Sequence, residues 1–331
     1  MSTDAGTRVV RVAVDALGGD HAPDEVVAGA LEAASETIHP VVFGPADLDA
    51  HGLEHVVTNG VVEMHAKPAE AVRALPDSSL VRAVRAVGDG DADAVVSAGN
   101  TGAVLAASLL HIRRLPGVHR PGIAVVIPGR VGSTVLIDAG ANAEAKPEHL
   151  AQYGHMGSLF ATEILGVAVP AVGLLSIGEE PEKGDQTTIE AHALLRESGL
   201  RFIGNVEGRV LLEGIVDVVV ADGFTGNVAL KTLEGTIRTL LTGLRAEITS
   251  TTVGKLGGLL IRPAAGRLRH RLDPETHGGG YLLGLRGLVV IAHGSSSRRA
   301  VGNAIRMAAR GVEHDVVGAV GQRLARGTAE P

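Results

Sequence analysis

The chain has 331 residues, of which 45% are hydrophobic and 2% aromatic, with 45 glycines, no cysteine and a net charge of −7. The absence of cysteine excludes a disulfide framework, thiolate metal ligands and a cysteine nucleophile, and the acidic charge argues against nucleic acid as the main partner. The sequence lacks a signal-like start and an apolar run long enough to span a membrane, so we expect a cytoplasmic protein.

Short apolar runs alternate with amphipathic segments along the chain, which predicts an α/β fold with a mostly parallel sheet. We predict strands at residues 8–15, 40–43, 56–64, 92–99, 123–127, 133–139, 171–177, 201–206, 218–221 and 287–292. We predict helices at residues 24–35, 76–87, 103–110, 146–165, 187–196, 227–252 and 298–311. No repeat, low-complexity tract or clear linker interrupts the series, which indicates a single domain.

The loop after the first predicted strand carries acidic and imidazole side chains. Asp15, Asp20 and His21 together could hold a metal ion, but a carboxylate can equally cap this turn. We expect no metal, and Asp15 and His21 stay candidates for substrate contact.

The strand predicted at 92–99 runs into a small polar turn, Asn100-Thr101-Gly102, and then into a helix. The side chains and amides of this turn could bind an anion, because the first N–H groups of a helix have no partner within it. Simple capping of the helix by Asn100 or Thr101 is an equally good interpretation.

Polar residues also mark the next two strands. Arg120 precedes one of them and could be an anion ligand, although we favour a surface charge. Asp138 and Asn142 follow the strand at 133–139, and open α/β sheets bind their ligands at the carboxyl ends of strands.

A third turn, Asp222 to Gly226, joins the buried strand at 218–221 to a long helix. We predict Thr225 as the N-cap, with the first amides of the helix free to bind phosphate. Asn227 and Lys231 are four residues apart and share one helix face, which indicates a cationic clamp on that anion. The alternative is a surface lysine paired with Glu234.

Residues 254–273 differ from the rest of the chain. Five basic residues occur there before the first acid, and Leu256, Leu259, Leu260 and Ile261 lie among them. Pro263 should interrupt a helix, so we predict a helical hairpin with an apolar tip and basic flanks. Such a surface suits an anionic membrane or an acidic protein, and the alternative is a dimer contact with a solvated basic face. The glycines at 278–280 are expected to form a flexible loop.

The last predicted strand, 287–292, ends at His293-Gly294-Ser295 before another helix begins. His293 at the carboxyl end of a buried strand is a candidate catalytic residue, and Ser295 is a candidate for substrate contact. The alternative for a lone histidine is a structural role.

Seven segments in this order resemble the PlsX family of phosphate acyltransferases. They are VAVDALGGDHAP near the start, SAGNTGA at 97–103, LIDAGAN at 136–142, LLSIGEEPEKG at 174–184, FIGNVEG at 202–208, ADGFTGNVALKTLEG at 221–235 and IAHGSSS at 291–297. One departure lies before the glycines at 278–280, where this chain has Thr276 and His277 instead of the family's tyrosine and acidic residues; Tyr281 is not a safe substitute.

The resemblance implies transfer of a fatty acyl group from acyl carrier protein to inorganic phosphate, giving acyl phosphate for phospholipid synthesis. It also implies an isocitrate-dehydrogenase-like, three-layer α/β/α domain with a hairpin inserted at about residues 236–273, a homodimer and peripheral membrane association. A membrane-bound acylphosphate:glycerol-3-phosphate acyltransferase would be a further partner. No cofactor is implied.

Phosphate is itself a nucleophile near neutral pH, so this reaction needs no enzyme-bound acyl intermediate. We place phosphate on Asn100, Thr101, Gly102, Thr225 and Gly226, with Lys231 balancing its charge. His293 or Asn227 would polarise the thioester, and Asp222 is a further candidate for substrate contact.

Two other classes of protein remain open from the sequence. A phosphotransacetylase-like or dehydrogenase-like enzyme would share the fold and the anion site, although no G-x-G-x-x-G motif follows the first strand. A non-enzymatic scaffold at the membrane would depend on residues 254–271 alone.

Overall fold

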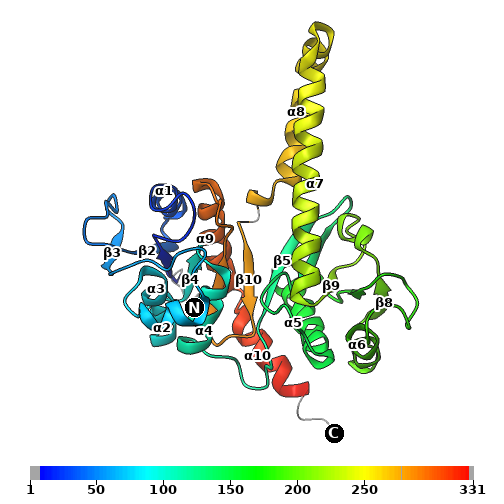
Figure 1. The fold of residues 1–331 in the computed structure, drawn as a ribbon, viewed down its shortest axis with the longest axis horizontal. Coiled ribbons are helices and arrows are strands. Elements are labelled where there is room, and N and C mark those ends of the chain that lie inside the picture. Colours follow the sequence, from blue (N-terminus) through cyan, green and yellow to red (C-terminus); the bar gives the residue numbers. More distant parts are fainter. Residues whose placement is uncertain (1–7, 277, 328–331) are drawn as a thin grey trace, which may run out of the picture.

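The structure is a computed structural model that describes residues 8–276 and 278–327 (Figure 1). The strands are β1 (Val10–Asp15), β2 (Ile38–Gly44), β3 (Glu54–Val57), β4 (Ala94–Ser97), β5 (Gly122–Pro128), β6 (Ser133–Ile137), β7 (Val172–Leu175), β8 (Phe202–Val206), β9 (Val218–Val220), β10 (Gly280–Leu283) and β11 (Leu288–Ile291). The α-helices are α1 (Asp24–Ala33), α2 (Pro68–Ala74), α3 (Ser79–Asp89), α4 (Thr101–His111), α5 (Pro147–Leu165), α6 (Gln186–Glu197), α7 (Gly223–Ser250), α8 (Thr252–Leu272), α9 (Arg298–Glu313) and α10 (Val316–Gly327). Two short 3-10 helices, η1 (Gly208–Leu212) and η2 (Pro274–Thr276), complete these elements.

The strands form one 11-stranded sheet in the order β3-β2-β1-β4-β11-β10-β5-β6-β9-β7-β8. Its neighbours are parallel except where β10 pairs with β11, β10 with β5, and β5 with β6. The predicted α/β fold with a mostly parallel sheet is therefore confirmed. The three antiparallel pairings divide the sheet into two halves whose strands run in opposite directions.

The register shows how these halves meet. Neighbouring partners across the centre are Val96 with Val290, Val290 with Tyr281, Tyr281 with Ala124, Ala124 with Ile137, and Ile137 with Val220. The carboxyl ends of β4, β11, β6 and β9 thus lie in one row across the sheet. β4 and β11 run toward this row in one direction, and β6 and β9 run toward it in the opposite direction. The loops after β4 and β11 leave the row in one direction, and those after β6 and β9 leave it in the other.

Helices cover both faces of the sheet and bury apolar side chains against it. One face packs against α1, α5, α6, α9 and α10. The other packs against α2, α3, α4 and the first turns of α7, where Leu230 is buried. α4 and α7 therefore lie on the same face of the sheet, on either side of its central strands.

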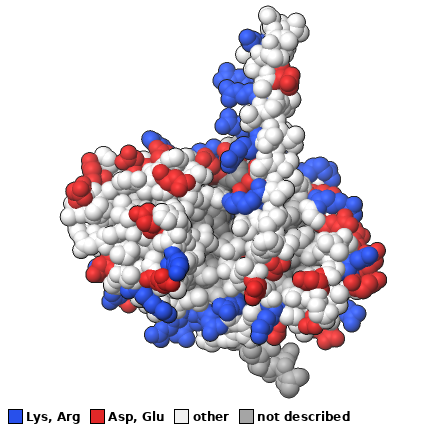
Figure 2. All heavy atoms as spheres, viewed as in Figure 1, with Lys and Arg blue, Asp and Glu red and all other residues white. Residues whose placement is uncertain are grey.

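The helices α7 and α8 form an antiparallel hairpin that projects far beyond the body of the molecule (Figures 1 and 2). The hairpin was predicted, but its turn is at Thr251 and not at Pro263. Pro263 lies within α8, and the helix continues past it. In the described residues, no helix is both long and apolar enough to cross a membrane.

The sequence analysis missed the α-helices α2 and α10, the strand β10, and both short 3-10 helices. The expected loop at 278–280 is wrong for Gly280, which opens the buried central strand β10. That strand is only four residues long and begins in a glycine run, so its signal is weak. The strand expected at 56–64 is also shorter, since β3 ends at Val57.

Candidate active site

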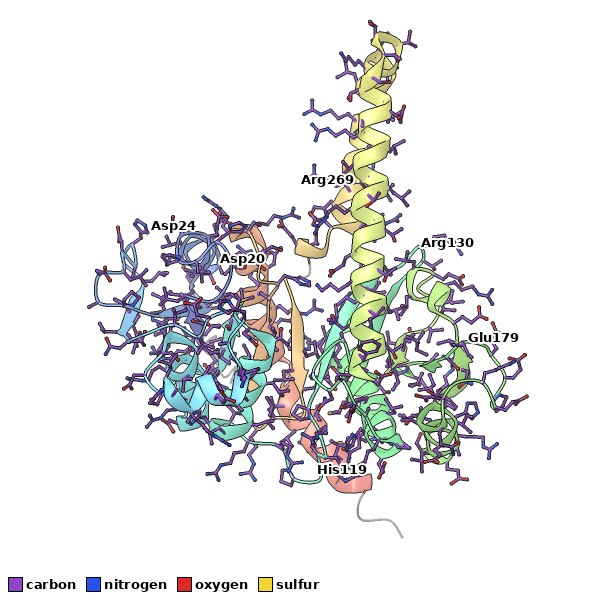
Figure 3. All side chains as sticks on the ribbon, viewed as in Figure 1. Asp20, Asp24, His119, Arg130, Glu179 and Arg269 are labelled. Carbon is purple, nitrogen blue, oxygen red and sulfur yellow. The ribbon has the colours of Figure 1, made fainter. Side chains whose placement is uncertain are left out.

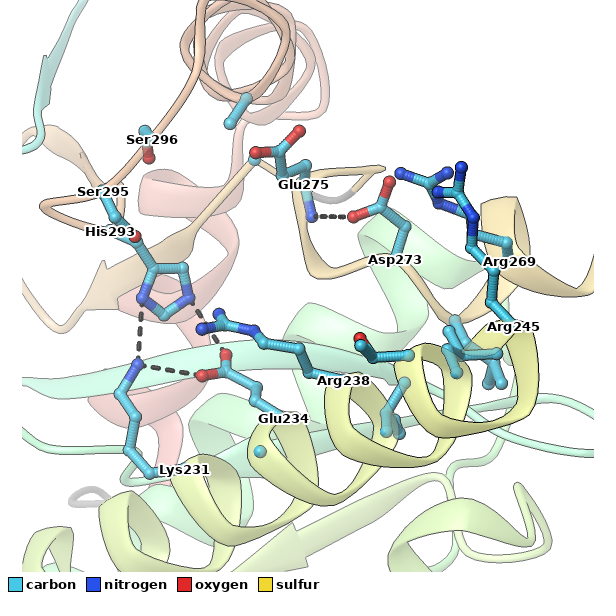
Figure 4. A pocket seen from close by; sticks show the side chains of 17 residues that line it. Lys231, Glu234, Arg238, Arg245, Arg269, Asp273, Glu275, His293, Ser295 and Ser296 are labelled. Carbon is cyan, nitrogen blue, oxygen red and sulfur yellow. Dashed lines mark hydrogen bonds and ion pairs between the residues drawn. The ribbon is translucent and has the colours of Figure 1, made fainter. Parts of the chain in front are cut away.

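Three side chains, two from α7 and one from the loop after β11, meet at the base of the hairpin (Figure 4). Lys231 Nζ lies 3.0 Å from His293 Nδ1 and 3.0 Å from Glu234 Oε2. His293 Nε2 lies 3.1 Å from Glu234 Oε1. Lys231 and Glu234 project from α7, while His293 follows β11, so this triangle joins the two halves of the sheet.

The chemistry of the triangle fixes which atom carries each proton. The ammonium group of Lys231 can only donate, so His293 Nδ1 accepts and the proton of the neutral imidazole is on Nε2, which donates to Glu234. Burial of Glu234 acts to raise the pKa of its carboxyl, but the hydrogen bonds from His293 and Lys231 and the positive charge of Lys231 outweigh it, so the pKa of Glu234 is lowered. Glu234 thus stays ionised and balances the charge of Lys231.

The start of α7 is closed to an external anion. The N-cap is Asp222 and not Thr225 as predicted: its Oδ1 accepts from the N–H groups of Phe224 and Thr225, each at 2.9 Å. Gly223 N donates to Asn142 O at 2.9 Å, and Gly226 N donates to Asp222 O at 2.8 Å. The amides that were expected to bind phosphate at Thr225 and Gly226 therefore already have partners.

Asp138 and Asn142 support this closed junction from the end of β6. Asp138 is fully buried and accepts from the N–H groups of Ile123, Gly140, Ala141 and Asn142. Burial raises the pKa of Asp138, and these donors oppose the rise. The Asn142 amide donates to Pro121 O at 2.6 Å and to Tyr153 Oη at 2.9 Å. Both predicted candidates thus organise the loop that holds α7.

The start of α4 is different. Asn100 Oδ1 accepts from Ala103 N at 3.1 Å, and Asn100 Nδ2 donates to Met64 O at 2.7 Å. The side chain of Asn100 therefore caps the helix and anchors the loop before α2. Among the described residues, none accepts a hydrogen bond from the N–H groups of Thr101 or Gly102. This junction offers two free amides.

The loops after β4 and β11 lie together near the triangle. The backbone carbonyl of Gly294, next to His293, accepts from Asp20 N at 2.7 Å, and Gly294 lies against the side chain of Met64. Met64 in turn holds Asn100. The start of α4, the loop of His293 and the loop after β1 are thus one cluster. On the opposite wall, Asn227 is exposed one turn before Lys231 and lies beside Gly140.

The remaining candidates lie apart from the triangle or support the fold. Asp15 is buried, accepts from Ser79 and Ser97 at 2.6 and 2.7 Å, and its pKa is raised by burial. His21 is exposed, and no group of three or more His, Asp or Glu able to hold a metal occurs in the described residues. Arg120 is exposed, and its neighbour His119 lies at the end opposite the hairpin in Figure 3.

Two further residues concern the segment where the chain departs from the family pattern. Tyr281 is a core residue that packs edge-to-face on Phe160 and donates to Met307 O. His277 lies outside the described residues.

A pocket of about 630 Å³ opens beside the triangle, at the base of the hairpin (Figure 4). Ser295 and Ser296 line it together with Arg269, one of the five basic residues noted at 254–273, and with Arg238 and Arg245, which the sequence did not single out. The sequence interpretation had noted Glu234 only as the partner of a surface lysine. Its spacing of three from Lys231 was a usable signal, but the contact with His293, 59 residues later, was not visible.

The sequence of the chain matches a known protein family and named proteins of that family. A family model described as "Fatty acid synthesis protein" matches residues 10–318. The phosphate acyltransferase of Heliobacterium modesticaldum is 44% identical over 334 residues, covering 97% of this chain and 99% of that protein. The phosphate acyltransferase of Pelotomaculum thermopropionicum is 46% identical and covers 92% of each chain.

Solved structures show a similar fold at low identity. The EutD phosphotransacetylase from Staphylococcus aureus has a TM-score of 0.60 at 19% identity and covers 92% of this chain and 94% of its own. A branched-chain phosphotransacylase from Enterococcus faecalis V583 has a TM-score of 0.57 at 17% identity and covers 91% of this chain and 99% of its own.

Proposed function

Because this chain belongs to the family of fatty acid synthesis proteins whose relatives are phosphate acyltransferases, we propose that it transfers a fatty acyl group from acyl carrier protein to inorganic phosphate. The chain is an acyltransferase of fatty acid and phospholipid synthesis, and acyl phosphate is its product. The carrier protein as donor is the finer part of this proposal. The observation that supports it most is the contact of Lys231 with His293 from across the sheet, since the loop of His293 packs through Met64 on the start of α4, where two amides are free.

In the proposed reaction, an oxygen of phosphate attacks the carbonyl carbon of the thioester. A tetrahedral intermediate forms, the C–S bond breaks, and the carrier's thiolate leaves and takes a proton from water. We place phosphate between the amides of Thr101 and Gly102 and the ammonium of Lys231. Positioning of two substrates can lower the barrier by about 7–11 kcal/mol, so no covalent enzyme intermediate is needed.

The triangle assigns a role to each of its members. Lys231 has three N–H donors, and two of them go to His293 and Glu234, so one is left for phosphate or for the developing oxyanion. A single such donor typically contributes about 3–4 kcal/mol to the transition state. Both ring nitrogens of His293 are occupied, so His293 acts here through Lys231, while Asn227 on the facing wall is free to polarise the thioester.

The proposed activity is tested by incubating the protein with acyl carrier protein that bears a fatty acyl thioester. We expect release of free carrier thiol that depends on inorganic phosphate, together with acyl phosphate in stoichiometric amount. Acyl coenzyme A is the comparison substrate, because the solved structures of similar fold are phosphotransacetylases. Turnover of acyl coenzyme A without turnover of the acyl carrier protein would overturn the choice of donor.

We also propose that the protein binds membranes peripherally through the end of the hairpin. Val253, Leu256, Leu259 and Leu260 are all more than half exposed there, on a helix that has basic residues and no acid. Leu259→Glu with Leu260→Glu should abolish co-flotation with anionic vesicles but keep activity in solution. Unchanged flotation would contradict this surface. A homodimer and a membrane acyltransferase that receives the product stay predictions, and light scattering tests the first.

A further inference from the structure

The hairpin carries its positive charges at a regular spacing. Lys231, Arg238 and Arg245 are seven residues apart on α7, and Lys255, Arg262 and Arg269 are seven residues apart on α8. Seven residues amount to about 20° less than two full turns of an α-helix, so each set lies along one side of its helix. Because the helices are antiparallel with a turn at Thr251, the two sets alternate along the hairpin. We call the five arginines and lysines beyond Lys231 the cationic track.

The two sets share one side of the hairpin. Arg238 and Arg245 from α7 line the same pocket as Arg269 from α8 (Figure 4). Figure 2 shows Lys and Arg side chains along the side of the hairpin that overlooks the other half of the molecule, and Figure 3 places Arg269 on that side. The track therefore rises from the triangle toward the tip, on the side that faces the body.

In the part of the chain that the structure describes, the cationic track has no acidic partner. Arg238, Arg245, Lys255, Arg262 and Arg269 are exposed, and none forms an ion pair with another residue in the described ranges 8–276 and 278–327. The acids that line the pocket have other partners: Glu234 with Lys231 and His293, Asp273 with Arg299 at 3.1 Å, and Glu275 with the hydroxyl of Ser297 at 3.0 Å. In a chain of net charge −7, an unneutralised row of five cations indicates an acidic partner.

The direction of the track favours a protein over a membrane. The two most exposed apolar residues of the hairpin, Val253 and Leu260, lie toward its tip, so a bilayer would meet the hairpin end-on; Leu240 and Leu268 are exposed lower on the shaft. The track instead runs down the shaft to the pocket, which ends at the triangle. A partner protein bound to this side lies in the angle between the hairpin and the body. A flexible arm of up to about 20 Å on that partner would reach Lys231.

We propose that the cationic track is the docking surface for the acidic carrier protein that presents the acyl thioester. This inference rests on the proposed function and adds the surface to it. The acidic face of the carrier lies along Arg245, Arg262 and Arg269, and its arm enters the pocket past Arg238. Half-buried Ile237, Leu241 and Leu272 line the pocket and give the arm and the first methylenes of the acyl chain an apolar wall.

The test compares two double variants with equal change in charge. Arg245→Glu with Arg269→Glu reverses the track, whereas Arg267→Glu with Arg271→Glu reverses two exposed charges that lie two residues either side of Arg269, about 160° around the same helix. We measure the affinity of fluorescently labelled acyl carrier protein by anisotropy, and the KM for its acyl form, at low and at physiological ionic strength.

We expect the track variant to bind the carrier at least about tenfold more weakly at low salt and to lose most of the salt dependence, because long-range attraction between opposite charges is what salt screens. The control variant should bind within about twofold of the wild type. A carrier protein whose acidic surface residues are changed to lysine should recover affinity for the track variant. Equal affinity of both variants for the carrier would overturn the proposal.

The other outcomes are also decisive. If the track variant keeps its affinity for the carrier but loses flotation with vesicles that contain phosphatidylglycerol, the track serves lipid and the proposal is wrong. If the wild type binds the carrier through the track but releases no thiol in the presence of phosphate, the proposed function fails while the docking surface stands. Circular dichroism of each variant checks that the hairpin is intact.

Discussion

The starts of α4 and α7 look alike in sequence, but they differ in whether their amides are available. Each follows a buried strand and a turn with glycine and a small polar residue. At α7, the first N–H groups donate to the carboxylate of Asp222, the carbonyl of Asp222 and the carbonyl of Asn142. At α4, Asn100 caps a single amide, and those of Thr101 and Gly102 stay free. A strand–glycine–helix motif thus predicts where an anion site can form, and tertiary partners decide whether it does.

The difference has a steric cause. The backbone of Gly226 presses against the carbonyl of Asp138 so closely that a Cβ at this position would overlap its oxygen. The backbone of Gly223 is equally close to Asn142, whose O and N would lie 2.6 and 2.8 Å from a Cβ there. Gly223 and Gly226 serve close packing of α7 on the loop after β6, and they do not serve to admit a ligand.

The largest expected effect comes from adding a methyl group where Gly226 meets the carbonyl of Asp138. Gly226→Ala should lower the free energy of unfolding by about 3 kcal/mol or more, because the methyl group meets a backbone atom that cannot move alone. Gly243→Ala on the same helix is the matched control, since nothing lies within 4 Å of its Cβ, and it should stabilise by about 0.5–1 kcal/mol. Urea denaturation measures both; equal midpoints would contradict the closed junction.

Lys231→Met tests the side of α7 that does face the substrate. Loss of the ammonium group should lower kcat/KM for phosphate by about a hundredfold, as for other single charge-stabilising donors. The side chain of Lys231 is half exposed, so the melting temperature should change little. Near-normal kinetics would remove Lys231 from the site, and a large loss of stability would make the kinetic result a folding effect.

Proline at the first helical position distinguishes the two junctions directly. Thr101→Pro removes a free amide at a position that tolerates proline, so KM for phosphate should rise about tenfold while stability is kept. Gly223→Pro removes an amide that is bonded to Asn142 O and should destabilise the fold instead. Steady-state kinetics and thermal melts separate the two results. A phosphate KM that is unchanged in Thr101→Pro would contradict an anion site at α4.

The smallest effect is expected from Glu234→Gln. Glutamine keeps a hydrogen bond to His293 but removes the charge opposite Lys231, so kcat should fall a few-fold while KM for phosphate does not rise. A purely structural role would raise KM together with the loss of kcat.

The lowered pKa of Glu234 also predicts a pH dependence of stability. The carboxylate contributes stability above its unfolded pKa of about 4.3 and loses it as pH falls through the lower folded value. The difference in unfolding free energy between wild type and Glu234→Gln should therefore be present at pH 7 and shrink below about pH 4. A difference that is independent of pH would contradict the ion pairs.

Much of the fold followed from periodicity, because the buried strands and the long amphipathic helices carry strong local signals. Nearly every predicted strand and helix is present within a few residues, as with α5, which begins at Pro147 and ends at Leu165 as expected. The misses have local reasons. β10 is short and begins with glycine, and Pro263 is accommodated in α8, a helix that has no buried residue.

The candidate site was less predictable because its contacts cross the sheet. His293 and Lys231 were both singled out, but their contact depends on the offset between two halves whose strands run in opposite directions. Asp138 and Asn142 have the composition of site residues and yet hold a loop. The N-cap of α7 had a usable signal, because aspartate is a stronger N-cap than threonine by residue type, but the prediction placed the cap at Thr225 and not at Asp222.

The most direct measurement is a crystal structure of the protein with inorganic phosphate bound. Our account predicts density for phosphate within hydrogen-bond distance of the N–H groups of Thr101 and Gly102 and of Lys231 Nζ, with the first turn of α7 unchanged. Phosphate bound instead at the start of α7, with the carboxylate of Asp222 displaced from the N–H groups of Phe224 and Thr225, would contradict it.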